Sequence, residues 1–543
     1  MYAPTSNLLE GIRHAFPLQM MPWDEYFPQM AEADFMLGRQ DTIAAKTFFI
    51  RKAPFGGSYA LLGGITAALR GISELRFDDE AFQYGMRQLG YSQPFLEWLK
   101  QRGRIQVKLW SGFEGDTIFP NQPSVTVVGS LPDTRFAEGI LTEALNFPTL
   151  ALTKWYRLVR SVRPGQVLEF GRRRAQHAQK ATLYGILAGC FATSHSDISR
   201  FFDVLLIGTM GHEWMQSFGD VKQAFDAWLR VKPNKPVGLI DTLQCLQHDF
   251  PAWLDAVYEH REAIKTANPP VWGWRNDSGD LAYLTIEQYV RFWKHPISQH
   301  EWFTDRMRTV LTNDLDEYTA QSILGQIRSQ AGEAGLNAED ILRRIVWAAG
   351  TKPSTCDDQP SLGGVAKLMQ VAQHACIKLA FDADGLPGVK TSIPGFNRSA
   401  LIRDRNGEPV CVLLFPHHRY DVTPETGHGR LCHKDSGAEL QGITACHPNN
   451  PGSRMEIKNY TAEPQQHLIY DTLTGDGFTS LWNDPTIVGV AEAVERNVDS
   501  LHWTQTRLQN PHTVKVSLTP DLFELRQEMI HRGVLREDYL TAA

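Results

Sequence analysis

The sequence lacks the features that mark a membrane or secreted protein. Its longest apolar candidate, ALLGGITAAL at residues 60–69, is too short and too rich in glycine to span a bilayer. The first residues, MYAPTSNLLEGIRH, contain no basic segment followed by an apolar core, which is the pattern of a secretion signal. The 7 cysteines are odd in number and form no CxxC pair, which favours reduced thiols over a disulfide framework. We therefore expect a cytoplasmic protein without a membrane segment.

The chain also lacks an excess of positive charge. Its 54 Lys and Arg residues are outnumbered by 61 Asp and Glu residues, and the net charge is −7. This balance disfavours general binding to nucleic acid, although a local basic site for phosphate groups remains compatible with it. A chain of 543 residues with 42% hydrophobic and 21% charged residues is typical of a globular protein with two or three domains.

Two common catalytic signatures are missing as well. The segment GTMGHEWMQSF at residues 208–218 places His212 beside Glu213, but the zinc-protease helix requires a second histidine at position 216, which is glutamine. His212 is therefore either a hydrogen-bonded structural residue or a group with acid, base or nucleophilic chemistry. The chain has no Walker motif, so any nucleotide would have to bind at another kind of phosphate site.

The middle of the chain is regular. Five apolar β-type segments each end in a polar or glycine-rich group, near Gly208, Asp241, Asp277, Asn313 and Gly350, at intervals of 33 to 37 residues. Helical stretches separate them, for example at 251–264 and 318–334. This alternation predicts an irregular α/β barrel over residues 166–390, with its active site at the carboxyl ends of parallel strands.

The flanking segments are less regular and mix helices with short strands. Residues 44–69 predict a strand, a glycine-rich turn and a helix. Beyond residue 390, ALIRDRNGEPVCVLLFP predicts a hairpin, and the tail predicts an amphipathic helix that opens at Thr519 and Pro520. We expect the segments 1–165 and 391–543 to form a second α+β domain together.

The predicted strand ends gather groups that suit phosphate chemistry. The segment EFGRRRAQ supplies three consecutive arginines, Arg172 to Arg174, and guanidinium groups match phosphate oxygens bidentately. SLGGVAKL at residues 361–368 predicts the start of a helix whose free N–H groups could hold another phosphate. Together with the acidic strand ends, these features suggest a multiply phosphorylated anionic substrate and carboxylates available for Mg²⁺.

Six segments carry a resemblance to a known family. FGRRRAQ, GTMGHEWMQSF, LIDT, RNDSGDL, NDLDE and QPSLGGVAKL occur in the order and spacing of nicotinate phosphoribosyltransferases, and TFFIRKAPFGGSYALLGGI and VKVSLTPDLFELR extend the similarity over most of the chain. The resemblance implies that nicotinate and phosphoribosyl pyrophosphate are converted to nicotinate mononucleotide and pyrophosphate, the first step of NAD salvage from nicotinic acid. It also implies coupling to ATP hydrolysis through a phosphorylated histidine.

The same resemblance implies roles for individual residues. Mg²⁺ would be the cofactor, ATP a co-substrate, and the protein a homodimer in which Tyr26 of one chain closes the nicotinate pocket of the other. The motif around Tyr26 is reduced to D.Y...M, and Ala380 and Asn397 replace a serine and a lysine that the family tends to have. The catalytic residues would be His212 and Asp277, the nicotinate-binding residues Tyr26, Thr209 and Arg275, and the phosphate-binding residues Arg173, Arg174, Ser278, Gly279, Asn313, Gly350, Thr351, Gly363 and Gly364.

Several alternatives compete with this interpretation. A metal-dependent barrel hydrolase or aldolase could use Asp277, Asp280, Asp314 and Asp316, but it would need histidine ligands or a Schiff-base lysine at the strand ends. A nicotinamide-using relative and an inactive regulatory paralogue share the fold, and assays with either pyridine would separate them. We assign no zinc site, because the set His428, Cys432, His433, Cys446 and His447 fits no standard finger spacing.

Overall fold

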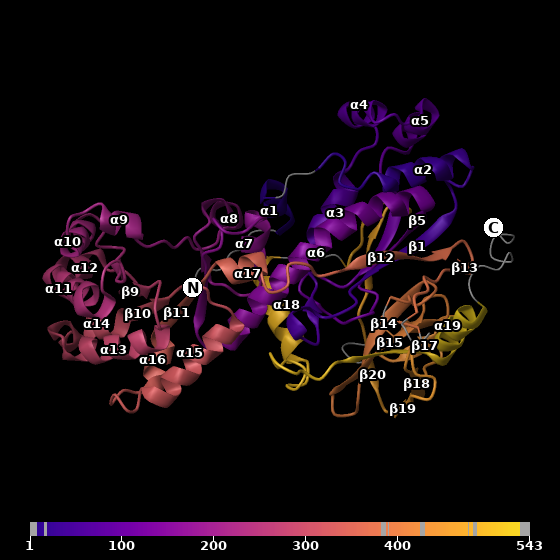
Figure 1. Cartoon of the computed structure of the whole chain (residues 1–543). Coiled ribbons are helices and arrows are strands. Elements are labelled where there is room, and N and C mark those ends of the chain that lie inside the picture. The colour runs from indigo at the N-terminus through magenta and orange to yellow at the C-terminus, as the bar shows by residue number, and fades with distance from the viewer. Residues whose placement is uncertain are drawn as a thin grey trace. The chain divides into compact units, whose positions relative to one another are not determined.

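The computed structural model describes residues 8–15, 19–381, 387–388, 390–423, 429–475, 477–481 and 486–532. These residues form two compact units, of which one comprises Lys154–Pro360 and the other combines Thr5–Thr153 with Ser361–Ala543 (Figure 1). The division falls inside one long helix, α6 (Leu131–Ser161). Our predicted barrel at 166–390 therefore overlaps the first unit, but residues 361–390 belong to the second.

The first unit contains a six-stranded sheet in which every neighbouring pair is parallel. The strand order is β7-β6-β11-β10-β9-β8, and no described ladder joins β7 to β8, so the sheet is an open half of a barrel. This result confirms the α/β class and the irregular barrel. The strands are β6 (Gln166–Glu169), β7 (Ala192–Thr193), β8 (Val237–Leu239), β9 (Trp272–Asn276), β10 (Met307–Leu311) and β11 (Ile345–Ala349).

Helices connect these strands at the intervals that the sequence predicts. The expected helices at 251–264 and 318–334 correspond to α11 with α12 and to α15, whereas the apolar run before Gly208 makes only an isolated parallel bridge, Thr193↔Leu206. The main helices of the unit are α7 (Ala178–Leu187), α10 (Val221–Val231), α11 (Phe250–Glu259), α12 (Arg261–Ala267), α13 (Leu281–Lys294), α15 (Glu317–Gln330) and α16 (Ala338–Arg344).

Buried tryptophans of β9 fill the interior of this unit. Trp272 and Trp274 are fully buried, and their indole N–H groups donate to Phe303 O at 2.6 Å and to Gln288 Oε1 at 2.8 Å. Gly273 lies between them because a Cβ there would lie 1.8 Å from Arg308 O of the next strand. Loss of such a buried aromatic side chain costs about 3–5 kcal/mol, so these residues stabilise the strand that carries Arg275.

The second unit joins both ends of the chain in one sheet. Its seven strands run in the order β13-β12-β1-β5-β3-β21-β22. This order confirms a second α+β domain built from N- and C-terminal segments. The strands are β1 (Ile43–Phe49), β3 (Val107–Ser111), β5 (Val125–Ser130), β12 (Val365–Val371), β13 (His374–Ala375), β21 (His467–Asp471) and β22 (Gly477–Phe478).

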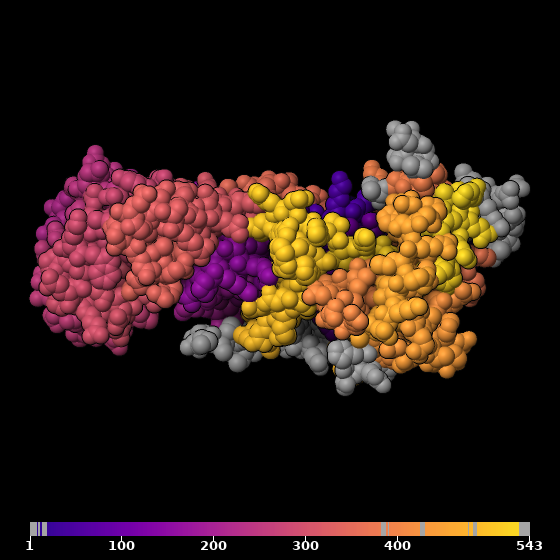
Figure 2. Space-filling view, turned by 90° about the horizontal axis from the view of Figure 1, so that it is seen from below, coloured from indigo at the N-terminus to yellow at the C-terminus, as the bar shows by residue number. Residues whose placement is uncertain are grey.

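A second sheet of this unit comes from the C-terminal segment alone. This segment is coloured orange and yellow in Figure 2. Its order is β19-β18-β23-β15-β14-β20, and β14 and β15 form the predicted hairpin. The predicted terminal helix is α19 (Pro520–Arg532), which begins at Pro520 as expected. The strands are β14 (Asn397–Arg403), β15 (Pro409–Pro416), β18 (Gly442–Cys446), β19 (Arg454–Lys458), β20 (Thr461–Pro464) and β23 (Lys515–Leu518).

The predicted helix after SLGG is wrong. Residues Val365–Val371 form β12, which pairs antiparallel with β1 from Phe49↔Val365 onward. The N–H of Gly364 donates to Asn146 Oδ1 at 2.9 Å, so this donor is already occupied. A phosphate-binding role for Gly363 and Gly364 stays a prediction, but it has no helix start behind it.

None of the described helices combines the length and the apolar character that crossing a membrane requires.

Candidate functional site

The carboxyl ends of the parallel strands bring His212 beside a buried carboxylate. His212 begins the short helix α9 (His212–Gln216), and its Nε2 lies 3.4 Å from Asp241 Oδ1, which follows β8. Asp241 Oδ2 accepts hydrogen bonds from the N–H of Asp277 at 2.9 Å and from Ser278 Oγ at 2.6 Å. Asp241 therefore ties the ends of β8 and β9 to the histidine.

This pairing sets the chemistry of the imidazole. At 3.4 Å the two groups are close but not hydrogen-bonded; a carboxylate that moves nearer to Nε2 would favour the tautomer with its proton on that nitrogen and leave the Nδ1 lone pair free. The Asp241 side chain is only 3% exposed, whereas that of His212 is 40% exposed. The arrangement presents an accessible imidazole that can act as a base or as a nucleophile.

Arg275 lies next to this pair at the end of β9. Its Nη2 donates to Met210 O at 3.5 Å, and the same carbonyl accepts Thr209 Oγ1 at 3.1 Å. The structure thus brings together two of the residues that we predicted to bind nicotinate. Burial lowers the pKa of the Arg275 guanidinium, the carboxylates of Asp277 and Asp241 oppose this effect, and Arg173 adds to it.

The Arg275 guanidinium has free capacity to bind an anion. Its side chain is 12% exposed, and its contact with Asp277 Oδ2 is long, at 3.8 Å. Its buried Nε has no hydrogen-bond partner among the described residues. Because arginine stays protonated in proteins, this position holds a positive charge with an unused donor.

Asp277 faces the end of the next strand. Its Oδ1 makes a short hydrogen bond with Thr312 Oγ1, and Thr312 also donates to Asn276 O at 2.7 Å. Asn313 and Asp314 follow with φ angles of +91° and +45°, in the left-handed region that Asn and Asp tolerate better than other side chains. The resulting turn leaves both residues exposed beside Asp277.

The arginine run and the last strand end complete this edge. Arg172, Arg173 and Arg174 follow β6, are exposed, and form no ion pair with another described residue. A Cβ at Gly350 would lie 2.9 Å from Phe170 O, so the chain approaches β6 closely just before Thr351 begins α17 (Thr351–Thr355). The edge therefore presents unpaired positive charge to solvent.

Two groups at this edge escaped the sequence analysis. Asp241 ends a predicted strand but received no role, although its position at a strand end is a usable signal. Glu169 is fully buried and accepts Thr193 Oγ1 at 2.6 Å and the N–H of Gly171 at 2.5 Å. Burial raises the pKa of Glu169 although these hydrogen bonds oppose it, and the contacts shape the turn that leads to Arg172.

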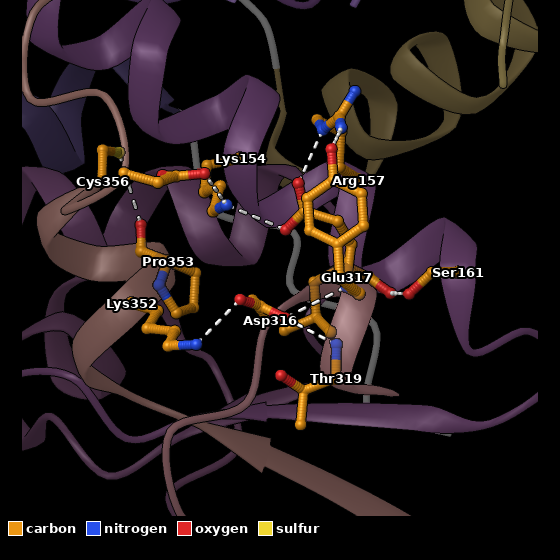
Figure 3. A network of polar contacts seen from close by, with 12 residues as sticks. Lys154, Arg157, Ser161, Asp316, Glu317, Thr319, Lys352, Pro353 and Cys356 are labelled. Carbon is orange, nitrogen blue, oxygen red and sulfur yellow. Dashed lines mark hydrogen bonds and ion pairs between the residues drawn. The ribbon is translucent and has the colours of Figure 1, made fainter. Parts of the chain in front are cut away.

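Behind the edge lies a network of buried charges (Figure 3). Lys352 Nζ contacts Asp316 Oδ2 at 2.9 Å, which links the segment after β11 to the segment after β10. Asp316 also caps α15 by accepting the N–H groups of Tyr318 and Thr319 at 3.0 and 2.7 Å. The neighbouring Glu317, whose side chain is fully buried, forms ion pairs with Arg157 Nε at 2.8 Å and Lys154 Nζ at 2.9 Å.

The second unit carries Tyr26 and a group of cations around Lys367. Tyr26 opens α2 (Tyr26–Met36), is 50% exposed, and its ring lies 4.0 Å from that of Phe27. Lys46 Nζ lies 5.8 Å from the Phe27 ring. Burial lowers the pKa of Lys367, and the nearby charges of Lys378 and Arg51 lower it further against the effect of Glu138. The sequence analysis did not assign Arg51 or Lys367.

In the described part of the chain, no group of three or more His, Cys, Asp or Glu side chains could hold a metal ion. His428 lies outside the described residues. Cys432 donates to Asp421 O at 3.4 Å, and His447 Nδ1 accepts the N–H of Asn449 at 3.2 Å.

The fold and the strand ends define an α/β protein whose parallel sheet gathers a histidine, carboxylates and unpaired arginines at one edge, groups that suit a small anionic ligand. Family models agree with this class. Residues 21–146 match the nicotinate phosphoribosyltransferase N-terminal domain, and residues 431–526 match the C-terminal domain of the same family.

Comparison with individual proteins identifies the family. The chain is 30% identical over 402 residues to the nicotinate phosphoribosyltransferase pncB2 of Mycobacterium tuberculosis, which covers 72% of this chain and 80% of the relative. It is 26% identical over 512 residues to the nicotinate phosphoribosyltransferase of Bacillus subtilis, with 94% of each chain covered. The crystal structure of human nicotinic acid phosphoribosyltransferase matches with a TM-score of 0.72 at 21% identity, and the match covers 93% of this chain and 99% of that one. The chain belongs to the nicotinate phosphoribosyltransferase family.

Proposed function

We propose that the protein transfers the phosphoribosyl group of phosphoribosyl pyrophosphate to nicotinate and acts in the cytoplasm, where its free cysteines stay reduced. The observation that carries this proposal is the buried Arg275 guanidinium, which has an unused Nε donor and shares the Met210 carbonyl with Thr209. A guanidinium in this setting suits the carboxylate of nicotinate better than the neutral amide of nicotinamide.

The transfer itself needs positioning and charge stabilisation. The ring nitrogen of nicotinate forms a bond to C1 of the ribose while the bond from C1 to the pyrophosphate oxygen breaks, and positive charge develops on the sugar. Asp277, directly after β9, would face this charge, and the exposed guanidinium groups of Arg173 and Arg174 would receive the departing pyrophosphate. No protein nucleophile is required in this step.

The donor set of the site suits Mg²⁺ that enters with the substrate. Mg²⁺ is usually held by one or two carboxylates together with phosphate oxygens and waters. Asp277 and Asp314 at the ends of β9 and β10 would hold it, and it would neutralise the charge of the pyrophosphate.

We further propose that ATP phosphorylates His212. Asp241 would keep the imidazole proton on Nε2, so that Nδ1 attacks the γ-phosphorus while the bond to the β–γ bridging oxygen breaks and ADP leaves. Water later removes the phosphoryl group. Phosphohistidine would add a charge of about −2 beside Asp241, enough to reorganise the segments at the strand ends.

An assay with both pyridines tests the proposed substrate. Nicotinate should be preferred to nicotinamide roughly tenfold to hundredfold, because one charge-assisted hydrogen bond contributes about 1.5–3 kcal/mol. Arg275→Ala should lose this preference together with most of the activity, whereas Arg328→Ala, which removes an exposed ion pair with Glu339, should keep both. Equal rates with both pyridines in the unmodified protein would contradict the proposal.

We also propose a homodimer in which Tyr26 and the cations around Lys367 complete the site of the partner. The half-exposed ring of Tyr26 supports this role, because such a ring can stack on a pyridine for about 1 kcal/mol. Tyr26→Ala and Arg275→Ala proteins, each of low activity, should regain activity when mixed under subunit exchange, since a mixed dimer then contains one intact site. Proven exchange without any recovery would show that each site is built from one chain.

A further inference from the structure

The second unit contains a cavity that the strand-end site does not use. Its volume is about 270 Å³, and it lies between residues of the two sheets of that unit. Phe49, Met369, Leu414 and Val516 contribute apolar surface from β1, β12, β15 and β23. A cavity of mixed lining with a few convergent polar groups is the usual form of a small-molecule site.

One wall of the cavity holds a buried arginine without a counter-charge. Arg526 of α19 is 2% exposed, and its Nη1 and Nη2 donate to Pro448 O at 2.6 Å and to Asn449 Oδ1 at 2.9 Å. Its Nε is buried and has no hydrogen-bond partner among the described residues. Arg526 also forms no ion pair with any described residue. Burial lowers the pKa of Arg526 to about 10, and no charge of the described residues offsets this effect.

A second polar atom in the cavity is also unsatisfied. Asn397 of β14 is 3% exposed, and its Nδ2 donates to Pro394 O at 2.9 Å and to Gly395 O at 3.1 Å. These contacts fix the orientation of the amide, and its Oδ1 is left as a buried acceptor without a partner. Arg526 and Asn397 both line the cavity, and each carries a buried polar atom that lacks a hydrogen-bond partner among the described residues.

The remaining lining agrees with an anionic occupant. Among the described lining residues there is no Asp or Glu, whereas hydroxyl groups come from Thr47, Thr391 and Ser392. His447 and Asn449 are solvent-exposed lining residues next to the Arg526 contact, so the cavity is accessible there. An unsatisfied buried guanidinium is costly, and an oxyanion would remove that cost.

We propose that this cavity is a second binding site for a small organic anion with a carboxylate or phosphate head, an apolar body and a hydrogen-bond donor. The head would bind Arg526, the body would lie against Phe49 and Met369, and the donor would reach Asn397 Oδ1. The inference does not rest on the proposed catalytic function, because all these residues lie in the second unit and none has a role in the transfer.

Titration calorimetry of the full chain with 4-hydroxybenzoate tests this site. We expect saturable binding that persists in Arg275→Ala, in which the strand-end arginine is absent. Arg526→Met should weaken binding tenfold to a hundredfold, as expected for the loss of a charge-assisted contact. Asn397→Val should weaken the binding of 4-hydroxybenzoate more than the binding of benzoate. The neutral compound 4-hydroxybenzyl alcohol should not bind.

Two further arms keep the test decisive. Val516→Phe narrows the cavity without touching the Arg526 contacts, so it should abolish binding in a folded protein even if Arg526→Met does not fold. Displacement by inorganic phosphate would support a phosphate head, and failure to displace would support a carboxylate. Binding that vanishes in Arg275→Ala and survives in Val516→Phe, equal binding of the neutral alcohol, or no heat at millimolar ligand would each overturn the proposal.

Discussion

Replacing Glu317 by alanine is expected to lower the free energy of unfolding by about 3–5 kcal/mol. The Glu317 side chain is 0% exposed and is paired with Lys154 and Arg157, which are 1% and 6% exposed. Removing the carboxylate takes one ion pair away from each of these two buried cations, and Lys154 retains its contact with Asp358 at 2.7 Å. The cost comes from the loss of a compensating negative charge at a place that water does not reach.

Urea unfolding followed by tryptophan fluorescence would measure this change. Glu339→Ala is the matched control, because Glu339 pairs with Arg328 at 3.0 Å while the two side chains are 62% and 54% exposed. Exposed pairs contribute about 0–1 kcal/mol, so this variant should unfold near the unmodified protein. Equal losses in the two variants would show that the buried network does not stabilise the first unit.

Replacing His212 by asparagine is expected to abolish both labelling by γ-labelled ATP and the stimulation of synthesis by ATP. The unmodified protein should acquire an acid-labile, base-stable phosphoryl group, because phosphohistidine has this stability. Basal formation of nicotinate mononucleotide should survive in part, since the transfer to the ribose does not use the imidazole. Loss of all synthesis in a folded variant would place His212 in the transfer step instead.

His248 provides a control for this experiment. It forms a comparable pair with a carboxylate, with 3.1 Å between His248 Nδ1 and Asp249 Oδ1, and its side chain is 48% exposed. It lies on the same unit but after the end of β8, outside the group of His212, Asp241 and Arg275. His248→Asn should keep the label and the ATP effect, so a loss there would indicate damage to the unit rather than to the phosphorylated residue.

The periodic part of the chain was the most predictable. Polar groups after apolar runs at regular intervals marked the ends of β8, β9, β10 and β11, and parallel pairing then brings those ends to one edge. Local signals also sufficed for the β14–β15 hairpin and for the start of α19 at Pro520. In each case the signal and the structure involve residues that are neighbours in sequence.

Features that depend on contacts between residues far apart in the sequence could not be predicted from it. The glycines before Val365 resemble a helix start, but pairing with β1 makes the segment a strand. Nothing local distinguishes the buried Lys154 or Arg526 from solvent-exposed cations, because their burial depends on packing against segments far away in the chain. The pairing of His212 with Asp241 likewise required the relative placement of two strand ends.

The pairing of β1 with β12 also affects the timing of synthesis. Phe49 pairs with Val365, so the ribosome adds 316 residues before this edge of β1 receives its neighbour. At about 5–20 residues per second this delay lasts roughly 15–60 s, during which an apolar strand edge is open to wrong partners. The first unit is made within that interval and can close early, since the ion pair of Lys154 with Asp358 joins its two ends. On the nascent chain, the first unit can therefore fold while β1 still lacks its neighbour β12. Shielding β1 during translation should then raise the yield of folded protein more than shielding any strand of the first unit.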